Sequence, residues 1–373
     1  MKYNLSDICD YVRGKVDVAS LIYENYISTE NMISNKGGIT SASSLPSVAQ
    51  TQSFQVGDIL VSNIRPYFKK IWFAEFNGGC SNDVLVLRAK DGISKKFLYY
   101  VLTDDTFFNY SMITSKGTKM PRGDKAAIMK YEVPGFTYKE QEKIAKILEA
   151  FDKKIQLNSN INDNLEQQAR ELFSNFYERA TESVPFTSII QILGGGTPKT
   201  SESSYWNGDI PFFTPKDVGC PYTFMTEKTI TEDGLNHCNS RLYPVNTIFV
   251  TARGTVGKVG LSGSPMAMNQ SCYALVGKDI EQLLVYFYTL ETVNALKHKA
   301  SGAVFDAITT KDFDSERVMQ LSENDSAVFL TIASPMFETI LSNCLENKRL
   351  IELRDALLPK LMSGEIDVSS VKI

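Results

Sequence analysis

The sequence predicts an α/β (α+β) fold in which two similar globules, related by a pseudo-twofold internal repeat, are separated by an antiparallel pair of long coiled-coil helices. Three observations favour this fold class. Short motifs recur at an offset of about half the 373 residues, each copy precedes a long segment of helical periodicity, and the globular parts mix short strands with helices. Two globular domains are expected, because a single core rarely grows beyond about 250–300 residues.

The internal repeat is clearest in two apolar runs that precede basic residues, at residues 57–74 and 246–261. The matched pairs are Ile59 with Ile248, Leu60 with Phe249, Val61 with Val250, Arg65 with Arg253, and Lys70 with Lys258. An offset of 181 to 189 residues also relates the motif at residues 5–8 to the motif at residues 186–189. A duplicated globule with a helix is suited to a target of two parts.

Residues 1–136 are the first predicted globule. Strands are predicted where short β-rich runs lie between Gly, Ser and Asn turns, at residues 58–62, 70–74 and 83–88. A helix is predicted over residues 95–106. Pro134-Gly135 ends this globule.

Residues 137–182 are predicted to form the first long helix. Residues 139–179 contain no Pro or Gly, and a 4-3 spacing is sustained over 33 residues, which corresponds to a helix of about 50 Å at 1.5 Å per residue. The seam comprises Ile144, Leu148, Phe151, Ile155, Asn158, Asn162, Leu165, Ala169, Leu172 and Phe176. A polar residue inside such a seam weakens packing and fixes register or partner number. The alternative is an ordinary amphipathic core helix with a polar interruption.

Residues 183–322 are the second predicted globule, reached through a short hinge at residues 181–186, and residues 323–373 hold the second long helix and a tail. Ser334 and Pro335 are a suitable N-cap and first-turn proline, and Gly364 is a suitable stop. The seam between them comprises Phe337, Ile340, Cys344, Asn347, Ile351, Arg354, Leu358 and Leu361. Each helix alone would expose an apolar stripe, so we expect antiparallel packing with one globule at each end.

The composition is that of a globular protein without a membrane partner. Apolar residues make up 43% of the chain, mean hydropathy is −0.15, and no run approaches the roughly 18 apolar residues of a membrane span. The N-terminal residues lack the pattern of a secretory signal, so a cytoplasmic location is expected. The six cysteines include no C-x-x-C pair, which disfavours a disulfide framework. A zinc site from Cys220, His237, Cys238 and Cys272 would have no standard ligand spacing.

Charge is unevenly distributed between the two halves. The net charge of −4 disfavours a free-standing, non-specific DNA-binding protein. Residues 65–130 nevertheless hold twelve Lys and Arg against six Asp and Glu, whereas residues 194–260 hold six of each. Basic side chains gathered in one domain neutralise phosphates even when the total charge is negative. Charge therefore favours nucleic-acid binding for the first globule only.

Motifs of catalysis and cofactor binding are missing. The segment at residues 194–199 is rich in glycine but lacks the P-loop spacing, and Pro198 removes an N–H that a phosphate cradle would use. Residues 253–258 fail the same pattern. No dinucleotide-binding fingerprint, H-E-x-x-H or amino-methyltransferase motif occurs. We therefore expect a non-catalytic chain that binds no cofactor or metal itself.

Polar and aromatic loop residues are suited to DNA instead. Arg bonds guanine and Asn or Gln bonds adenine in a bidentate way, each worth about 1–3 kcal/mol of discrimination, while Lys more often contacts phosphate. The candidates in the first globule are Asn63, Arg65, Tyr67, Lys69, Lys70, Ser81, Asn82, Lys116, Thr118, Lys119 and Arg122. Those in the second are Thr197, Lys199, Lys216, Arg253, Thr255, Lys258, Asn269, Gln270 and Ser271, with a turn at residues 301–303. For any single residue the alternative is a solvated loop side chain.

Several segments resemble the specificity subunit of type I restriction-modification systems. The second globule contains Gly195-Gly196-Thr197-Pro198-Lys199 and the Y-W-N-G-D-I-P string within residues 205–217. Further segments are residues 117–122 before 131–134, residues 141–144, and L-R-D-A-L-L-P-K-L at residues 353–361. The resemblance covers essentially the whole chain. The first globule lacks the G-G-T-P and Y-W-N-G-D-I-P strings, so the two globules are expected to read different half-sequences.

The resemblance implies partners and a split DNA target. A specificity subunit binds two methyltransferase subunits through its paired helices and joins ATP-driven restriction subunits; S-adenosylmethionine, ATP and Mg would then be bound by those partners. The helix contacts implied are Ile144, Leu148, Phe151, Ile155, Leu165, Leu172, Phe337, Ile340, Ile351, Leu358 and Leu361. A helix-set separation of about 35–50 Å corresponds to roughly one helical turn of B-DNA or somewhat more. We therefore expect two short defined segments around an unspecified spacer.

Two other classes of function remain open. A coiled-coil assembly scaffold, whose globules bind proteins without DNA specificity, would show no salt-dependent DNA affinity. An unrecognised enzyme using Glu232, Asp233 and His237 would show activity of the purified chain alone on DNA with Mg²⁺.

Overall fold

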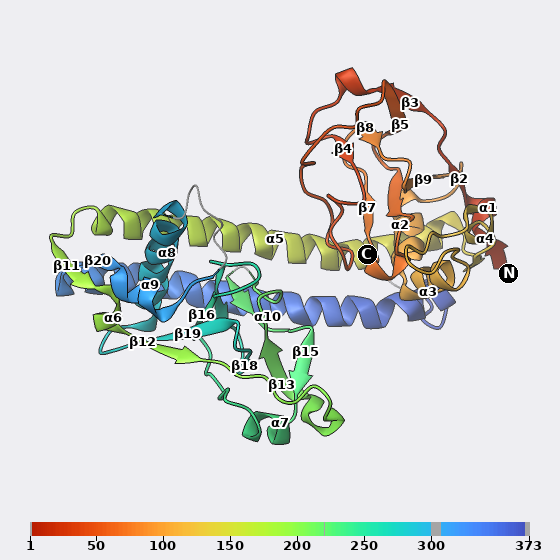
Figure 1. Ribbon diagram of the computed structural model, residues 1–373. Coiled ribbons are helices and arrows are strands. Elements are labelled where there is room, and N and C mark those ends of the chain that lie inside the picture. Colours follow the sequence, from red (N-terminus) through yellow and green to blue (C-terminus); the bar gives the residue numbers. More distant parts are fainter. Residues whose placement is uncertain (1, 220, 300–306, 370–373) are drawn as a thin grey trace. The chain divides into compact units, whose positions relative to one another are not determined.

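A computed structural model describes residues 2–219, 221–299 and 307–369 (Figure 1). The chain forms two compact units, each with its own hydrophobic core. Unit 1 comprises residues 1–155 and 349–373, and unit 2 comprises residues 156–348. Both long helices begin in one unit and end in the other, because the unit boundaries fall within them.

Unit 1 is built on a central antiparallel sheet of four strands. Its order is β2 (Cys9–Tyr11), β9 (Val84–Ala89), β6 (Ile59–Ser62) and β7 (Ile71–Phe73). A second sheet has the order β3 (Lys15–Asp17), β5 (Gln50–Phe54), β8 (Gly78–Cys80) and β4 (Tyr26–Ile27), and β1 (Lys2–Asn4) pairs with β10 (Glu132–Pro134). The shorter helices are α1 (Leu5–Ile8), η1 (Val18–Ser20), η2 (Pro66–Phe68), α2 (Lys95–Thr103), α3 (Asp105–Ile113) and α4 (Lys125–Ile128).

The central sheet of unit 1 is covered on both faces. Ile59 and Val61 of β6 pack in the core that contains α2, whereas Leu60 between them packs against Phe54 and Trp72. A strand buried on both faces is a continuous apolar run, which is why the sequence predicted β6 so clearly. The predicted helix over residues 95–106 is divided at Asp104, whose carboxylate accepts from the Thr106 amide and begins α3.

Unit 2 repeats this plan with an extra edge strand. Its main sheet has the order β12 (Ile190–Gly194), β19 (Cys272–Gly277), β16 (Ile248–Thr251), β17 (Val259–Ser262) and β14 (Tyr222–Thr223). The second sheet has the order β15 (Lys228–Ile230), β13 (Trp206–Phe213) and β18 (Ala267–Met268), and β11 (Glu182–Pro185) pairs with β20 (Arg317–Gln320). The shorter helices are α6 (Phe186–Ile189), η3 (Ser203–Tyr205), α7 (Glu232–Asn236), α8 (Gln282–Lys299) and α9 (Thr310–Ser315).

Backbone hydrogen bonds confirm the predicted repeat. The motifs at residues 5–8 and 186–189 form α1 and α6. The Ser62 amide donates to the Lys70 carbonyl at 3.0 Å, and the Thr251 amide donates to the Lys258 carbonyl at 2.9 Å, so these lysines are equivalent. The predicted hinge at residues 181–186 is wrong, because most of it is strand β11, the counterpart of β1.

The predicted match of Arg65 with Arg253 is wrong by one residue. Ile64 forms an isolated bridge with Arg122, and Arg253 forms the equivalent bridge with Ala307. The loop after β6 therefore places Ile64 where the loop after β16 places Arg253. Arg65 begins an additional aromatic turn.

The first long helix, α5, spans Tyr138–Tyr177. Thr137 caps its start, since its hydroxyl accepts from the Glu140 amide and its own amide donates to the Glu140 carboxylate. All ten predicted seam residues are buried or half-buried. In unit 1 Ile144 and Leu148 share a core with Leu358 and Leu361 of α10, and in unit 2 Ala169 and Phe176 share a core with α10 residues that include Phe337 and Ile340.

The second long helix, α10, spans Glu323–Ser363, so its predicted start at Ser334-Pro335 is wrong. The helix is capped twelve residues earlier, where the Ser322 hydroxyl accepts from the Asp325 amide and donates to the Asp325 carboxylate. Pro335 lies inside the helix, where proline removes one backbone hydrogen bond. The helix continues through Pro335 because the residues before it pack in the protein interior: Phe329 and Ala333 are buried in the core of unit 2.

The seam asparagines form polar pairs between α5 and α10 in unit 2. Asn158 is 1% exposed, and its Nδ2 donates to Glu346 Oε2 at 2.7 Å and to Asn347 Oδ1 at 2.9 Å. Asn162 Oδ1 accepts from Asn343 Nδ2 at 2.9 Å. The partner numbers fall on α10 as they rise on α5, so the helices are antiparallel within this unit. A slipped register would bury these amides unpaired, at about 1–3 kcal/mol each.

Among the described residues one helix, α10, meets the length and composition required to cross a membrane, with a mean hydropathy of 1.4 over its most apolar 18 residues. Only 22% of that window is buried. Its core positions are Phe329, Ala333, Phe337 and Ile340, at the 3-4 spacing of a helix that packs one face against a globule. Val328 and Ile332 lie on the exposed remainder.

Candidate nucleic-acid interface

Three loops of unit 1 meet beside the end of β6, and we call them the first loop cluster: residues 63–70, 81–83 and 116–124. The Asn63 amide donates to the Asp83 carbonyl at 2.8 Å, and the Gly123 amide donates to the Asn63 carbonyl at 3.1 Å. The Arg65 amide donates to the Pro121 carbonyl at 2.8 Å. All the predicted DNA-binding residues of the first globule therefore lie in one connected set of loops.

The predicted basic loop is a hairpin. Lys116 and Arg122 exchange two backbone hydrogen bonds of 2.9 Å, and Gly117 takes a φ of 91° at the turn that a side chain would strain. Thr118 and Lys119 are exposed at its tip. Lys116 pairs with Asp124 at 2.6 Å and Arg122 with Asp83 at 3.1 Å.

These ion pairs orient the hairpin, but they leave its basic side chains available to phosphates. Lys116 holds the pKa of Asp124 at about 2, well below its usual range. Both basic side chains are more than half exposed, so phosphates compete readily for them.

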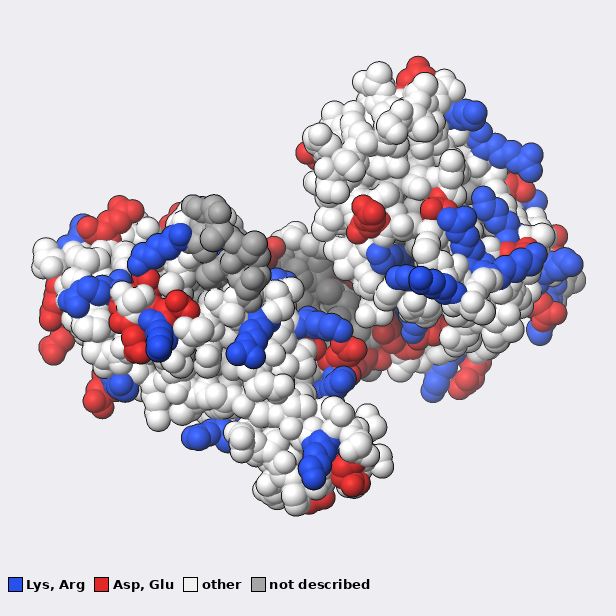
Figure 2. Space-filling model, in the orientation of Figure 1, with Lys and Arg blue, Asp and Glu red and all other residues white. Residues whose placement is uncertain are grey.

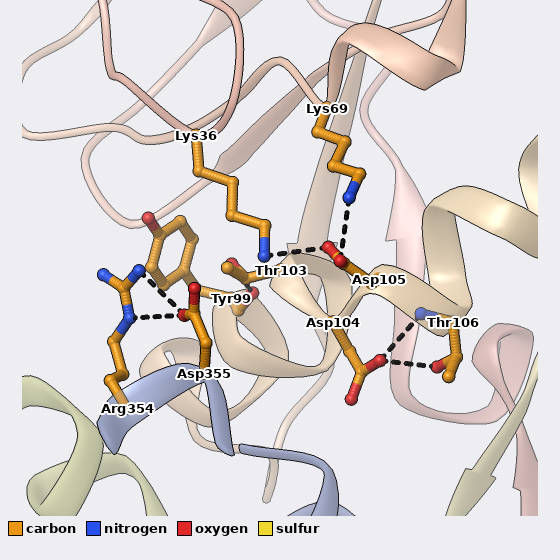
Figure 3. Close-up of polar contacts among 9 residues, drawn as sticks. All are labelled: Lys36, Lys69, Tyr99, Thr103, Asp104, Asp105, Thr106, Arg354 and Asp355. Atoms are coloured by element: carbon orange, nitrogen blue, oxygen red, sulfur yellow. Dashed lines mark hydrogen bonds and ion pairs between the residues drawn. The ribbon is translucent and has the colours of Figure 1, made fainter. Parts of the chain in front are cut away.

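Lys69 and Lys70 have intramolecular partners. Lys69 and Lys36 both pair with Asp105 at the start of α3, at 2.7 and 3.0 Å (Figure 3). Lys70 Nζ donates to the Thr29 carbonyl at 2.6 Å, and burial lowers its pKa. These lysines hold the loop in place, and a contact with DNA stays a prediction for both.

Asn63 also lies inside the protein. Its side chain is 8% exposed and rests against Gly123, while its backbone joins two of the loops. A contact of Asn63 with DNA stays a prediction. The other predicted residues of the first globule are exposed or half-exposed: Arg65, Tyr67, Lys69, Lys70, Ser81, Asn82, Lys116, Thr118, Lys119 and Arg122.

Unit 2 carries the second loop cluster at the same end of β16: residues 195–199, 252–258 and 269–271. The Ala252 and Arg253 amides both donate to the Ser271 carbonyl, at 2.8 and 3.2 Å. The Ser271 amide donates to Asn269 Oδ1 at 3.0 Å. The cluster therefore also brings together predicted residues that are far apart in sequence.

The glycines of the G-G-T-P-K motif allow this close approach. A Cβ on Gly195 would lie 2.2 Å from the Asn269 carbonyl oxygen, and one on Gly196 would lie 2.6 Å from the Asn239 amide nitrogen. The motif thus rests directly on the neighbouring loop, and the Thr197 hydroxyl donates to Gln270 Oε1. Trp206 Nε1 donates to the Lys199 carbonyl at 3.1 Å, which fixes the other end.

The second cluster has a more open charge arrangement. Arg253, Lys199 and Lys258 are exposed and form no ion pair with a residue that the structure describes. The Thr255 hydroxyl donates to the Pro215 carbonyl at 2.9 Å, and the neighbouring Lys216 lies 3.7 Å from Glu227. The predicted turn at residues 301–303 lies outside the described residues.

The surface charge follows the sequence. Figure 2 shows Lys and Arg side chains gathered on unit 1 over α2, α3 and α4, whereas on the visible face of unit 2 the two signs are interspersed. Affinity from phosphate neutralisation is therefore expected mainly from unit 1.

Sequence reasoning missed a basic cavity of about 700 Å³ in unit 1. Its lining includes Arg13, Lys15, Asn82 and Lys125. The three basic side chains form no ion pair within the described part of the chain. Arg13 and Lys15 follow β2 as the G-G-T-P-K motif follows β12, and this equivalence could have identified them.

The residues of the two alternative interpretations, a zinc site and an acid–histidine site, lie in ordinary structural contacts where the structure describes them. His237 pairs with Asp233 at 3.1 Å and stacks on Tyr205. Burial raises the pKa of the Cys272 thiol to about 12. No group of three or more potential ligands that could hold a metal occurs within residues 2–219, 221–299 and 307–369, and Cys220 lies outside them.

The family model and the relatives that match this sequence all describe the same kind of protein. A family model described as "Type I restriction modification DNA specificity domain" matches residues 1–167 and 179–320. The chain is 24% identical to the "Type I restriction enzyme HindI specificity subunit" of Haemophilus influenzae, over 98% of this chain and 99% of that protein. It is 29% identical to the "Type I restriction enzyme EcoR124I/EcoR124II specificity subunit" of Escherichia coli, over 57% of this chain and 56% of that protein.

A solved structure supports the fold. The S subunit of a type I restriction-modification system from M. genitalium has a TM-score of 0.59, with 99% of this chain and 96% of that chain covered, at 16% identity. The predicted fold class is confirmed, while the coiled-coil details of the helix pair and the placement of one globule at each end of it stay predictions. By its family match and its relatives, the chain belongs to the type I restriction-modification DNA specificity family, whose members recognise DNA and leave catalysis to partner subunits.

Proposed function

We propose that the chain recognises a bipartite DNA target, with unit 1 reading one half-site and unit 2 the other. The observation that carries this proposal is the repeated loop cluster. Both units place polar and basic loops beside the same strand end, β6 in one and β16 in the other. A duplicated site on a duplicated fold is suited to two segments of one ligand.

The two clusters present different chemistry, which supports two different half-sequences. The first offers Arg122 and the Lys119 tip of a hairpin, and the second offers Arg253 and Gln270 on tightly packed loops. Arg favours guanine and Gln favours adenine in the major groove. The lysines of both clusters supply phosphate affinity without sequence choice.

We further propose that the chain assembles with two methyltransferase subunits and with restriction subunits in the cytoplasm. Exposed apolar pairs one helical turn apart support a protein partner: Leu157 with Ile161 on α5, and Val328 with Ile332 on α10. The partner contacts predicted from the sequence are seam residues instead, and most of those are buried within a unit. S-adenosylmethionine, ATP and Mg are assigned to the partners.

Mapping methylated adenines in host DNA tests the function directly. Two short defined segments around an unspecified gap are expected, and a continuous site would contradict the proposal. Binding to a mapped duplex should weaken steeply with salt. An affinity independent of salt would favour the assembly scaffold.

A length change in the helices tests the split target. Seven residues added between Ile155 and Gln156, and seven between Lys348 and Arg349, lengthen each helix by about 10 Å. The unread gap should widen by about three base pairs, at roughly 3.4 Å each. An unchanged gap would show that the helices do not set the spacing.

A further inference from the structure

The η2 turn of unit 1 exposes two neighbouring aromatic side chains. Tyr67 is 48% exposed and Phe68 is 37% exposed, and their ring centroids lie 4.7 Å apart. Neither belongs to a hydrophobic core of the unit. Lys70 Nζ lies 5.8 Å from the Phe68 ring, within the same loop cluster as the basic hairpin. The pair is therefore an apolar surface bordered by positive charge.

The backbone on either side of the aromatic pair is strained. Arg65 has a φ of 50° and Lys69 a φ of 49°, in the left-handed region that residues other than glycine rarely adopt. Such conformations persist only where the surroundings enforce them, and they concentrate at functional sites. Within the turn, the Phe68 amide donates to the Arg65 carbonyl and the Lys69 amide to the Pro66 carbonyl, both at 2.9 Å.

Two other segments hold the turn from outside. The Asn35 amide donates to the Phe68 carbonyl at 2.8 Å, and the Lys36 amide donates to the Lys69 carbonyl at 2.9 Å. Figure 3 shows the side chains of Lys36 and Lys69 converging on Asp105 of α3. The aromatic pair is thus mounted on a stiff support.

Unit 2 shows that the fold does not require this turn. The equivalent loop between Thr251 and Lys258 reaches positive φ with glycines, at Gly254 and Gly257. Its one large apolar residue, Val256, packs against the core of unit 2. Unit 1 therefore has exposed aromatic rings and strained non-glycine residues where a shorter glycine loop suffices.

We propose that Tyr67 and Phe68 form an aromatic wedge that stacks on one base-pair step of the half-site read by unit 1. The wedge rests on the proposed function and adds a mechanism to it. Apolar side chains inserted at a base step unstack it and bend the duplex, so that more protein surface meets the DNA. Insertion has to overcome the stacking energy of the two base pairs. A stiff turn keeps its aromatic rings in position against that energy better than a mobile loop does. Lys116 and Lys119, which belong to the same loop cluster, can bind phosphates near the step.

The experiment uses the full chain assembled with its methyltransferase subunits. Wild-type complex first selects a duplex from a randomised pool, and 2-aminopurine is then placed at each position of that duplex in turn. At one step, wild-type binding should raise the fluorescence several-fold as the probe unstacks. The double variant Tyr67→Ala/Phe68→Ala should lose this signal and bind about 10- to 100-fold more weakly. Its salt dependence should be unchanged, because no phosphate contact is removed.

Two control variants separate stacking from other effects. Tyr67→Phe keeps the ring and should retain both fluorescence and affinity. Tyr138→Ala removes a tyrosine of similar exposure, 53%, from the start of α5 and should behave as wild type. Base flipping at the methylated adenine also brightens 2-aminopurine, but that signal should persist in every variant.

The outcomes distinguish the wedge from the function on which it rests. If the double variant keeps wild-type affinity and fluorescence, the wedge is refuted while DNA recognition stands. If Tyr67→Phe loses as much affinity as the double variant, the Tyr67 hydroxyl supplies the affinity, and ring stacking is again refuted. If the wild-type complex selects no duplex, the proposed function fails and the wedge fails with it.

Discussion

The guanidinium of Arg354 on α10 donates a hydrogen bond to the carboxylate of Asp152 on α5, with 2.7 Å between Nη1 and Oδ1. The other carboxylate oxygen accepts from the Tyr100 hydroxyl of α2 at 2.6 Å. One half-buried carboxylate therefore joins three helices of unit 1. Arg354 also pairs with its neighbour Asp355 at the surface.

We expect Asp152→Ala to lower the free energy of unfolding of unit 1 by about 2–4 kcal/mol, because a partly buried guanidinium and a phenol lose their acceptor. Asp355→Ala is the matched control, and its exposed pair should be worth less than about 1 kcal/mol. Urea denaturation followed by circular dichroism measures both. Equal effects would show that the three-helix contact adds no stability.

Leu148→Asp should unfold unit 1 or destabilise it by more than about 4 kcal/mol, because Leu148 is 0% exposed in the core and a carboxylate would be buried unpaired. Leu157→Asp on the same helix is the control, since Leu157 is 53% exposed. Thermal melts should show the control to be as stable as wild type. Co-purification should then show that it binds methyltransferase subunits more weakly, and unchanged assembly would remove Leu157 from the partner surface.

Arg253→Ala should weaken recognition of the half-site read by unit 2 by about 5- to 150-fold, the loss of one bidentate base contact. Assembly should be unaffected, because the loop and the helix seam are separate surfaces. Methylation of duplexes that vary at one position of that half-site provides the measurement, and Arg241→Ala is a control of equal charge change. A variant that fails to assemble would show that Arg253 is structural.

Asp105→Asn should loosen the η2 turn and lower the free energy of unfolding by about 0.5–1 kcal/mol at pH 7, a small value because the carboxylate is half-exposed. Burial raises the pKa of Asp105, but hydrogen bonds from Lys69 and Lys36 outweigh it and leave the pKa below its usual value. The stabilisation is therefore complete above the unfolded pKa near 3.9 and is lost as pH falls through the folded pKa.

Urea denaturation of wild type and Asp105→Asn at pH 7, pH 5 and pH 3.5 tests this direction. The difference between them should be constant at the two higher values and should shrink at the lowest. A difference that grows on acidification would contradict the assigned partners.

Much of the fold was predictable because it rests on repeated short patterns. Ile59, Leu60 and Val61 are buried on alternate faces of one strand, and this is a property that an apolar run reports directly. The seam of α5 was predictable because its periodicity is uninterrupted. The start of α10 was not, because Pro335 is tolerated inside a helix whose Phe329 and Ala333 are held by tertiary packing.

The candidate site was predictable as a set of loops and less so residue by residue. Sequence order cannot show that Lys69 meets Asp105, since the two lie 36 positions apart. It also cannot show that Asn63 faces inward. The sequence match paired Arg65 with Arg253 because the two residues are of the same type. The backbone bridges follow the strand register instead, and they make Ile64 the equivalent of Arg253.

The asparagine pairs between α5 and α10 have a consequence for recombination between related genes. Asn158 and Asn162 near one boundary of unit 2, and Asn343 and Asn347 near the other, lie on a single uninterrupted stretch, residues 156–348. A gene segment that encodes this stretch carries both members of every pair. Recombination that exchanges it between related genes would therefore transfer a new reading unit with its helix alignment already specified.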